Sequence, residues 1–271
     1  MPRLRNDVVV QIGTRREGLP LNQRRVTLEL TNACQLKCKM CPRNYVDMKI
    51  GYMPDMFFRS LVSQLPQTAT IFPFWRGESS LYPWFEDLML FAKQWAHNGR
   101  VVIATNGIAL NGPRLWGFMA AHVVSVSIHN NMGYQGLLNL LRERRTNNPK
   151  LHVAASIVEG ERTGINPKAL KVADEVRIYE EHTKKGVWGS IGLRRTGVQE
   201  WCSRLDTDLV IAWDGSVSRC CYVWDPIPGL SAISMSLKEI LASPQFKAIR
   251  ENYPDKICSK CSQWIGKGKT L

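Results

Sequence analysis

The sequence contains no long apolar run: no stretch of eighteen residues is apolar throughout, so we expect no membrane-spanning helix. Its beginning, MPRLRNDVVVQIG, has neither an apolar segment long enough for a signal peptide nor an acylation motif. Low-complexity segments and a Lys/Arg-rich tail are also missing. With 44% hydrophobic and 22% charged residues, the balance is that of an ordinary folded protein. These features predict a globular protein of the cytoplasm that has no membrane partner.

The chain is short of acidic residues, and its formal net charge is +13. Such an excess is compatible with nucleic acid or an anionic substrate as a partner. The basic residues are dispersed, however, with only small groups at Arg24-Arg25, at residues 142–145 and at Arg194-Arg195. A solvated basic surface is therefore the favoured interpretation, and a nucleic-acid partner stays open but is not favoured.

Strand-like and helical patterns alternate about six times between residues 26 and 185. The expected strands read RVTLELT, ATIFPFW, RVVIATNG, VVSVSIHNN, KLHVAASIVEG and VRIYEEH. Alternation of this kind predicts a parallel sheet with right-handed crossovers, in which the loops that follow the strands share one rim. Residues 1–25 are expected to form an N-terminal extension to this core.

The pattern changes from about residue 186. DLVIAWDGSVSRCCYVWD predicts a hairpin turned at Asp214-Gly215. SLKEILASPQFKAIRENY predicts a helix that Ser236 opens, with Glu239 completing a capping box. We therefore expect residues 186–271 to form a small C-terminal extension made of a β-hairpin and a helix.

Eight cysteines fall into two groups, one near the N-terminus and one in the last third of the chain. Without a secretion signal, clustered cysteines indicate metal binding rather than disulfides. The first group, Cys34, Cys38 and Cys41, has the spacing C-x3-C-x2-C. It permits three buried residues on one helix face, a zinc site, or an iron–sulfur cluster with one iron left open. Pro42 disfavours the helix.

This spacing, in the loop after the first strand, resembles the signature of the radical S-adenosylmethionine (SAM) superfamily. The resemblance covers nearly the whole chain and implies a partial (β/α)6 TIM-like barrel over residues 26–185. It also implies that Cys34, Cys38 and Cys41 hold a catalytic [4Fe–4S] cluster whose open iron binds SAM. An electron from a donor such as flavodoxin or ferredoxin would then cleave SAM to a 5′-deoxyadenosyl radical, which abstracts a substrate hydrogen.

Further motifs carry the same resemblance. The family's Gly-Gly-Glu-Pro motif, which holds the SAM ammonium, stands here as RGES, so that Gly77 and Glu78 match while Arg76 and Ser79 depart. TNG at residues 105–107 and GYM at residues 51–53 also match the family, whereas His129-Asn130 replaces its frequent Asp-Gly. The SAM-binding residues implied by the resemblance are Met40, Gly77, Glu78, Ser79, Asn106 and Ser127.

The second cysteine group supplies four candidate ligands, Cys202, Cys220, Cys258 and Cys261, which would suit zinc or a fully ligated four-iron cluster. The layout resembles the SPASM/twitch extension of radical SAM enzymes, which implies an auxiliary [4Fe–4S] cluster. Cys221 is then a spare cysteine. It is either a hydrogen-atom donor to a substrate radical or, as we favour, a small buried hydrophobic residue.

The resemblance thus implies a radical SAM oxidoreductase that oxidises, epimerises or dehydrates a small polar molecule of the sugar or aminocyclitol kind. The layout is most similar to radical SAM dehydrogenases of aminoglycoside pathways. Alternatives are a peptide maturase, which the short N-terminal extension disfavours, a nucleotide- or nucleic-acid-modifying enzyme, and an inactive metal-binding scaffold. The intact cysteines and Glu78 disfavour the scaffold. The residues that could line the substrate rim are Arg194, Arg195, His129, Glu181 and His182, each more often a surface residue.

Overall fold

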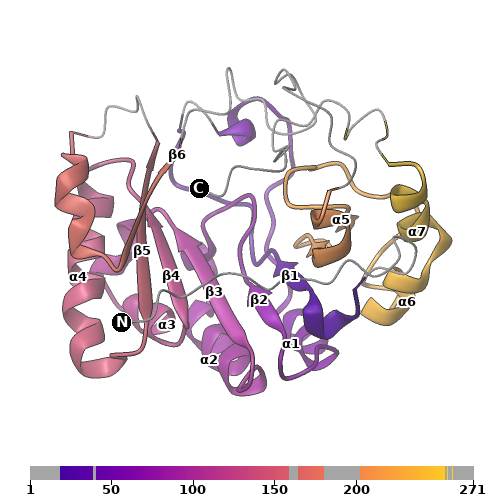
Figure 1. The fold of residues 1–271 in the computed structure, drawn as a ribbon, viewed down its shortest axis with the longest axis horizontal. Helices are drawn as coiled ribbons and strands as arrows, with labels where there is room; N and C mark the ends of the chain where they lie inside the picture. The colour runs from indigo at the N-terminus through magenta and orange to yellow at the C-terminus, as the bar shows by residue number, and fades with distance from the viewer. Residues whose placement is uncertain are drawn as a thin grey trace.

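The computed structural model describes residues 19–38, 41–158, 164–179 and 202–253, together with Asp255 and Cys258. One sheet carries the fold, as Figure 1 shows. Its strands are β1 (Arg25–Leu28), β2 (Thr70–Phe72), β3 (Arg100–Thr105), β4 (Val123–Ser127), β5 (His152–Val158), β6 (Glu175–Tyr179), β7 (Asp208–Ile211) and β8 (Val217–Ser218). Helices that cross a bilayer need a long apolar stretch, and no helix in these ranges has one.

The sheet order is β6-β5-β4-β3-β2-β1-β7-β8. All neighbours pair in parallel except β7 and β8, which form an antiparallel hairpin. The first six strands follow chain order from β1 to β6, which is the arrangement that right-handed crossovers produce. The predicted α/β fold with a partial (β/α)6 barrel is confirmed.

The crossover helices lie along the outside of this sheet (Figure 1). They are α1 (Asp55–Ser63), α2 (Phe85–Trp95), α3 (Leu115–Met119) and α4 (Asn131–Asn147). Each turns apolar residues towards the strands, for example Phe58 and Leu61 of α1, which are fully buried. Between β5 and β6 the expected helix is a 3-10 helix, Pro167–Val172. The core is thus one continuous layer of side chains between the sheet and its helices.

The C-terminal region contains α5 (Arg204–Thr207), the β7–β8 hairpin, α6 (Leu237–Ala242) and α7 (Pro244–Glu251). The single helix expected after Ser236 is wrong: Ser243 ends α6 and caps α7, whose first residue is Pro244. Proline cannot continue α6, because its ring lacks the N–H and clashes with the preceding turn. The capping box of Ser236 and Glu239 forms as expected.

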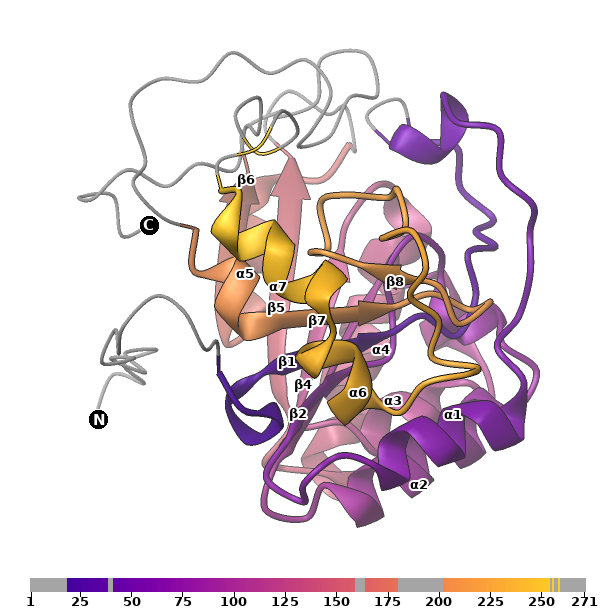
Figure 2. The same ribbon diagram turned by 90° about the vertical axis from the view of Figure 1, so that its right-hand side faces the viewer.

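The hairpin has a position that the sequence did not reveal. β7 pairs in parallel with β1, with Val26 opposite Leu209, so the C-terminal region adds two strands to the barrel sheet. Figure 2 shows β7 and β8 beside β1, with α6 and α7 in front of them. All four β7 residues are buried, which is typical of an internal strand of a parallel sheet. Strand β8 runs back towards the start of β7, so Cys220 and Cys221, which follow β8, lie towards the end of the sheet where β1 begins at Arg25.

Candidate functional site

The first cysteine group lies in the loop that follows β1. Cys34, Cys38 and Cys41 are half-buried, and the Cys41 N–H donates to the carbonyl of Cys38. Burial raises the pKa of the Cys34 and Cys41 thiols, and the neighbouring cysteines raise both further. A cavity of about 550 Å³ opens beside Cys34. Among the described residues, no three His, Cys, Asp or Glu side chains are gathered tightly enough for a single metal ion.

Two polar residues ahead of Cys34 fix the shape of this loop. The Thr31 hydroxyl donates to the Gly51 carbonyl at 2.7 Å, and the Asn32 side chain accepts from the Gly51 N–H at 2.9 Å. Asn32 also donates to the Lys49 carbonyl at 2.8 Å. Both residues are buried, so their hydrogen bonds close the cysteine loop at its base and return the chain towards α1.

The segment after β2 packs directly against the cysteine loop. A Cβ atom at Gly77 would lie 2.4 Å from the Thr31 carbonyl oxygen and 2.5 Å from that of Ala33, so only glycine fits. The Glu78 N–H donates to the Ala33 carbonyl at 2.7 Å. Glu78 is thereby anchored through its backbone to the residue that precedes Cys34.

The Glu78 carboxylate is 3% exposed and is surrounded by hydrogen-bond donors. Its Oε1 accepts from the Ser80 hydroxyl at 2.7 Å and the Thr105 hydroxyl at 2.9 Å, while Oε2 accepts from the Asn106 N–H at 2.8 Å. Burial nonetheless raises the pKa of Glu78, and these hydrogen bonds oppose the shift. Oε2 has room for a further donor, since a carboxylate oxygen has two lone pairs. An ammonium group therefore fits the chemistry of this site.

The other described residues that the resemblance assigns to SAM have different partners. Asn106 links Glu78 to the first cysteine loop, because its N–H donates to the Glu78 carboxylate and its side-chain amide lies 3.9 Å from the Cys34 sulfur. The Ser79 hydroxyl instead donates to the Pro73 carbonyl at 2.6 Å. Ser127, at the end of β4, shares a hydrogen bond of 3.1 Å with the hydroxyl of Ser156 on β5.

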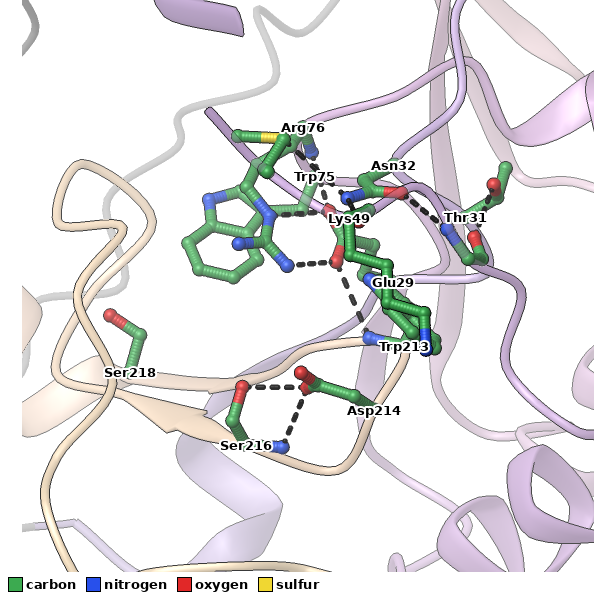
Figure 3. Close-up of polar contacts among 12 residues, drawn as sticks. Glu29, Thr31, Asn32, Lys49, Trp75, Arg76, Trp213, Asp214, Ser216 and Ser218 are labelled. Atoms are coloured by element: carbon green, nitrogen blue, oxygen red, sulfur yellow. Dashed lines mark hydrogen bonds and ion pairs between the residues drawn. The ribbon is translucent and has the colours of Figure 1, made fainter. Parts of the chain in front are cut away.

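Arg76, which departs from the family motif, has a partner in the barrel. Its guanidinium binds Glu29 at two positions, 2.8 Å from Oε1 and 2.5 Å from Oε2. Glu29 follows β1, is fully buried and also accepts from the backbone N–H of Arg76 and of Trp213. Figure 3 shows the pair at the junction of β1, β2 and the β7–β8 turn. The Glu29–Arg76 ion pair neutralises two charges, and burying either charge alone would be costly.

Aromatic residues extend this junction to the second cysteine group. The Arg76 guanidinium stacks 4.3 Å above the Trp75 ring, and the Trp75 indole N–H donates to the Cys221 carbonyl at 2.7 Å. Trp213 lies against Gly51, where an added Cβ would be 2.3 Å from the indole ring. The segment of residues 75–78 therefore contacts the first cysteine loop at one end and the second group at the other.

In the second group, Cys202 precedes α5, Cys220 follows β8 and Cys258 comes after α7. Burial raises the pKa of Cys220 well above its usual value, and the neighbouring Cys221 and Cys202 add to the shift. Arg219 forms an ion pair with Asp255, and its Nη1 lies 3.9 Å from the Cys258 sulfur. Burial, followed by the Asp255 charge, raises the pKa of Cys258 to about 12.

Cys221 has different surroundings from Cys220. Its sulfur accepts from Arg204 at 3.5 Å, and Arg204 also binds Asp208 at 3.2 Å. Burial raises the pKa of Cys221 to about 12, and Asp208 acts in the same direction. As a thiol it accepts a hydrogen bond within a charged network at the start of β7, an environment more polar than the hydrophobic one expected for it.

Several predicted residues lie outside the described ranges: Met40, Cys261, Glu181, His182, Arg194 and Arg195. Of the rim candidates, His129 is described and immediately precedes Asn130, which caps α4. Sequence reasoning missed Glu29, Trp75 and Trp213. The signal that could have pointed to the Glu29–Arg76 pair is an acidic residue at the end of an otherwise apolar strand, together with a basic residue after the next strand where the family has glycine.

Comparison with known proteins agrees with this geometry. Residues 202–262 match the model of SPASM, an iron–sulfur cluster-binding domain. No curated protein matches the chain. Among solved structures, BtrN in complex with AdoMet and 2-DOIA is 14% identical with a TM-score of 0.61, over 88% of this chain and 92% of BtrN.

Two further structures share the fold. SuiB from Streptococcus suis bound to S-adenosylmethionine is 11% identical, with a TM-score of 0.57, over 90% of this chain and 71% of SuiB. anSMEcpe with bound AdoMet and Cp18Cys peptide is 12% identical, with a TM-score of 0.58, over 83% of this chain and 81% of anSMEcpe.

The chain therefore has the fold of radical SAM enzymes and carries a SPASM-type iron–sulfur cluster-binding domain at its C-terminal end. The fold expected from the resemblance is confirmed, and residues 202–262 match the SPASM family expected for the C-terminal extension. For the C-terminal domain, the matching family also confirms that the expected cofactor is an iron–sulfur cluster.

Proposed function

We propose that the chain is a radical SAM enzyme with two [4Fe–4S] clusters. Cys34, Cys38 and Cys41 would hold the cluster that binds SAM, with Met40, Gly77, Glu78, Ser79, Asn106 and Ser127 around the SAM molecule. Cys202, Cys220, Cys258 and Cys261 would hold the auxiliary cluster. Residues 1–25, 26–185 and 186–271 are the corresponding extension, barrel and auxiliary domain. When bound, the first cluster and SAM would supply a hydrogen-abstracting radical.

The observation that carries this proposal is the anchoring of Glu78 to the first cysteine loop. A SAM molecule chelated at an open iron must present its ammonium beside the cluster. Glu78 lies there because its N–H binds the Ala33 carbonyl, and its carboxylate is held by Ser80, Thr105 and Asn106. Preorganised and shielded from water, this carboxylate would form a charge-assisted hydrogen bond to the ammonium. Three thiols and one such carboxylate suit a cluster with an open iron.

The auxiliary site would differ in having four thiols and therefore no open iron. The barrel and this site meet at the Glu29–Arg76 pair and at the hydrogen bond from Trp75 to Cys221. A fixed distance between two clusters would let the auxiliary cluster take the electron that remains after hydrogen abstraction, which an oxidation needs. The first electron would come from a donor protein such as flavodoxin or ferredoxin.

For the substrate, we favour a small polar molecule of the sugar or aminocyclitol kind. The match to BtrN, crystallised with AdoMet and 2-DOIA, covers 92% of that chain, more than the shares of SuiB and anSMEcpe. Oxidation, epimerisation and dehydration all begin with the same hydrogen abstraction. To identify the substrate, deuterated candidates are incubated with the reconstituted enzyme, and 5′-deoxyadenosine is analysed by mass spectrometry. Transfer of deuterium identifies the substrate, and 5′-deoxyadenosine formation without transfer from any sugar or aminocyclitol contradicts the assignment.

A peptide substrate is the second candidate, because two structures of this fold were solved with peptides, SuiA and Cp18Cys. Deuterium transfer from a labelled peptide, and none from sugars, would favour it. Modification of a nucleotide or nucleic acid remains a third reading, motivated by the net charge of +13. A nucleic-acid substrate would bind with an affinity that falls steeply as salt rises, because bound cations are released from its phosphates.

A further inference from the structure

Arg43 lies two residues after Cys41, in the 3-10 helix Pro42–Asn44. Its backbone N–H forms a hydrogen bond to the Cys41 thiol, and its side chain lines the cavity beside Cys34. The same cavity is lined by Leu36, Lys37, Asn44 and Tyr45. Arg43 is thus held to the first cysteine loop through its backbone and borders the cavity beside Cys34.

The Arg43 side chain contains a buried, unsatisfied hydrogen-bond donor, because its Nε atom is buried and has no hydrogen-bond partner. In the part of the chain that the structure describes, it is the one buried side-chain nitrogen or oxygen in this condition. Leaving a buried donor without an acceptor destabilises the fold, and more so when the group is charged. Such a group in a folded protein needs an explanation, and a bound ligand that supplies the acceptor is one of the usual ones.

The acceptor that the cavity beside Cys34 would offer to the Arg43 Nε–H is sulfur. No carboxylate of the described residues forms an ion pair with Arg43, and the cavity is bordered by a cysteine and a second cation, Lys37. Arg43 therefore borders the same cavity as Cys34, one of the three candidate cluster ligands, and follows another, Cys41, by two residues.

We infer that the Arg43 Nε–H donates a hydrogen bond to a sulfur of the first iron–sulfur cluster, and that its charge raises the reduction potential of that cluster. The inference rests on the proposed function, because it needs a cluster at Cys34, Cys38 and Cys41. Hydrogen bonds to cluster sulfurs and nearby charge are recognised determinants of cluster potential. A cation and a donor beside the cluster both favour the reduced state, which carries one more negative charge. Arg43 would thus ease the electron's arrival at the site where SAM is cleaved.

The test compares three variants in anaerobically reconstituted protein: Arg43→Gln, Arg43→Lys and Lys37→Gln. Iron content, and the midpoint potential of each cluster from an EPR-monitored redox titration, are measured for each. We expect R43Q to shift the one-electron reduction equilibrium of the first cluster about tenfold towards the oxidised form, about 59 mV. R43K keeps the charge but loses the Nε donor, so it should lie between R43Q and wild type. K37Q removes an exposed charge from the same cavity and should change little, because solvent screens it.

The auxiliary cluster provides an internal control, since its potential should be the same in all variants. An unshifted first cluster in R43Q, or an equal shift in K37Q, would overturn the inference. R43Q could also lose iron from the first site only. In that case an unchanged melting temperature of the apo-protein supports the inference. A lower melting temperature shows that Arg43 stabilises the fold and overturns the inference. Equal iron content in wild type and Cys34→Ala would instead refute the proposed function at this site, which is a separate outcome.

Discussion

The two cysteine groups differ in how the fold holds them. The first lies within eight residues on one loop, whose shape depends on neutral hydrogen bonds from Thr31 and Asn32 and on the close approach of Gly77. The second is assembled from three separate segments through charged contacts, such as Arg219 with Asp255. A buried carboxylate accompanies each group, but Glu78 beside the first accepts from neutral donors, whereas Asp208 beside the second is paired with Arg25 and Arg204. The first group is therefore local to one loop and held by neutral hydrogen bonds, whereas the second depends on contacts between segments far apart in the chain.

The strongest test of this comparison removes one cysteine from each group. Cys38→Ala should abolish 5′-deoxyadenosine formation from SAM, because three thiolates are needed to hold the first cluster. Cys220→Ala should leave SAM cleavage measurable while lowering the iron content by up to about four per chain. Chromatography of the nucleoside and iron analysis provide the two readouts. Cleavage that survives in C38A, or disappears equally in both variants, would remove the distinction between the sites.

Glu78→Gln removes the negative charge of Glu78 while keeping the shape of its side chain, and so tests whether that charge contributes to SAM binding. A hydrogen bond to a charged group contributes about 1.5–3 kcal/mol, so SAM should bind roughly ten- to a hundredfold more weakly. Iron content should not change, because Glu78 is not a cluster ligand. Equilibrium binding of SAM to the reconstituted variant measures the effect, with Glu86→Gln on α2 as the control. Equal SAM affinity in wild type and E78Q would contradict the role of Glu78.

The same variant makes a prediction for the stability of the apo-protein. Burial raises the pKa of Glu78, so the folded state binds its proton more tightly than the unfolded chain does. This contribution to stability is complete below the unfolded pKa of about 4.3 and is lost as pH rises through the raised folded value. Apo-E78Q should therefore melt at a higher temperature than wild type at pH 8, and the difference should shrink as pH falls. An unchanging difference between pH 8 and pH 5 would show that the charge is not costly there.

The Glu29–Arg76 pair lies in the barrel and contacts the C-terminal region through the Trp213 N–H, which donates to Glu29. Arg76→Met leaves a fully buried carboxylate unpaired, which should cost about 3–5 kcal/mol in unfolding free energy. The double variant with Glu29→Gln should recover part of this loss, because no charge is then left alone. The control is Arg59→Met on α1, whose half-buried i,i+4 pair with Asp55 should contribute less than about 1 kcal/mol. Urea denaturation measures all four proteins, and equal losses for R76M and R59M would refute the buried role.

The smallest expected effect comes from Trp75→Phe, which keeps an aromatic side chain but removes the indole N–H that donates to the Cys221 carbonyl. The loss of one such hydrogen bond should cost about 1 kcal/mol. We expect this loss to appear mainly as weaker retention of the auxiliary cluster, followed as iron release to a chelator. Trp116→Phe, at an exposed position of α3, is the matched control. Identical iron release in both variants would show that Trp75 does not support the second site.

Much of the first site could be predicted from the sequence because its parts follow consecutive strands. In a parallel sheet, residues after β1, β2 and β3 meet at one edge, so the cysteine loop, Glu78 and Asn106 were expected together. The position of β7 beside β1 could not be predicted, because a fully apolar strand does not show which neighbour it takes. The break at Ser243-Pro244 could have been predicted, since proline disfavours a continuous helix.

The pairings that join distant segments also escaped prediction. Glu29 and Arg76 are 47 residues apart, and Trp75 reaches Cys221 across 146 residues. Such contacts depend on side-chain direction and sheet register, which local patterns do not encode. The buried Nε of Arg43 is of the same kind: the sequence shows a basic residue after a cysteine, and only the structure shows that its donor has no partner.

The central claim is that one cluster binds SAM and the other does not. It is tested most directly by EPR spectra of the reduced, reconstituted protein recorded with and without SAM. We predict two cluster signals, of which only the one that is missing in C38A changes when SAM is added. Three results would contradict this account: zinc in place of iron, about four irons per chain instead of eight, or two EPR signals neither of which changes when SAM is added.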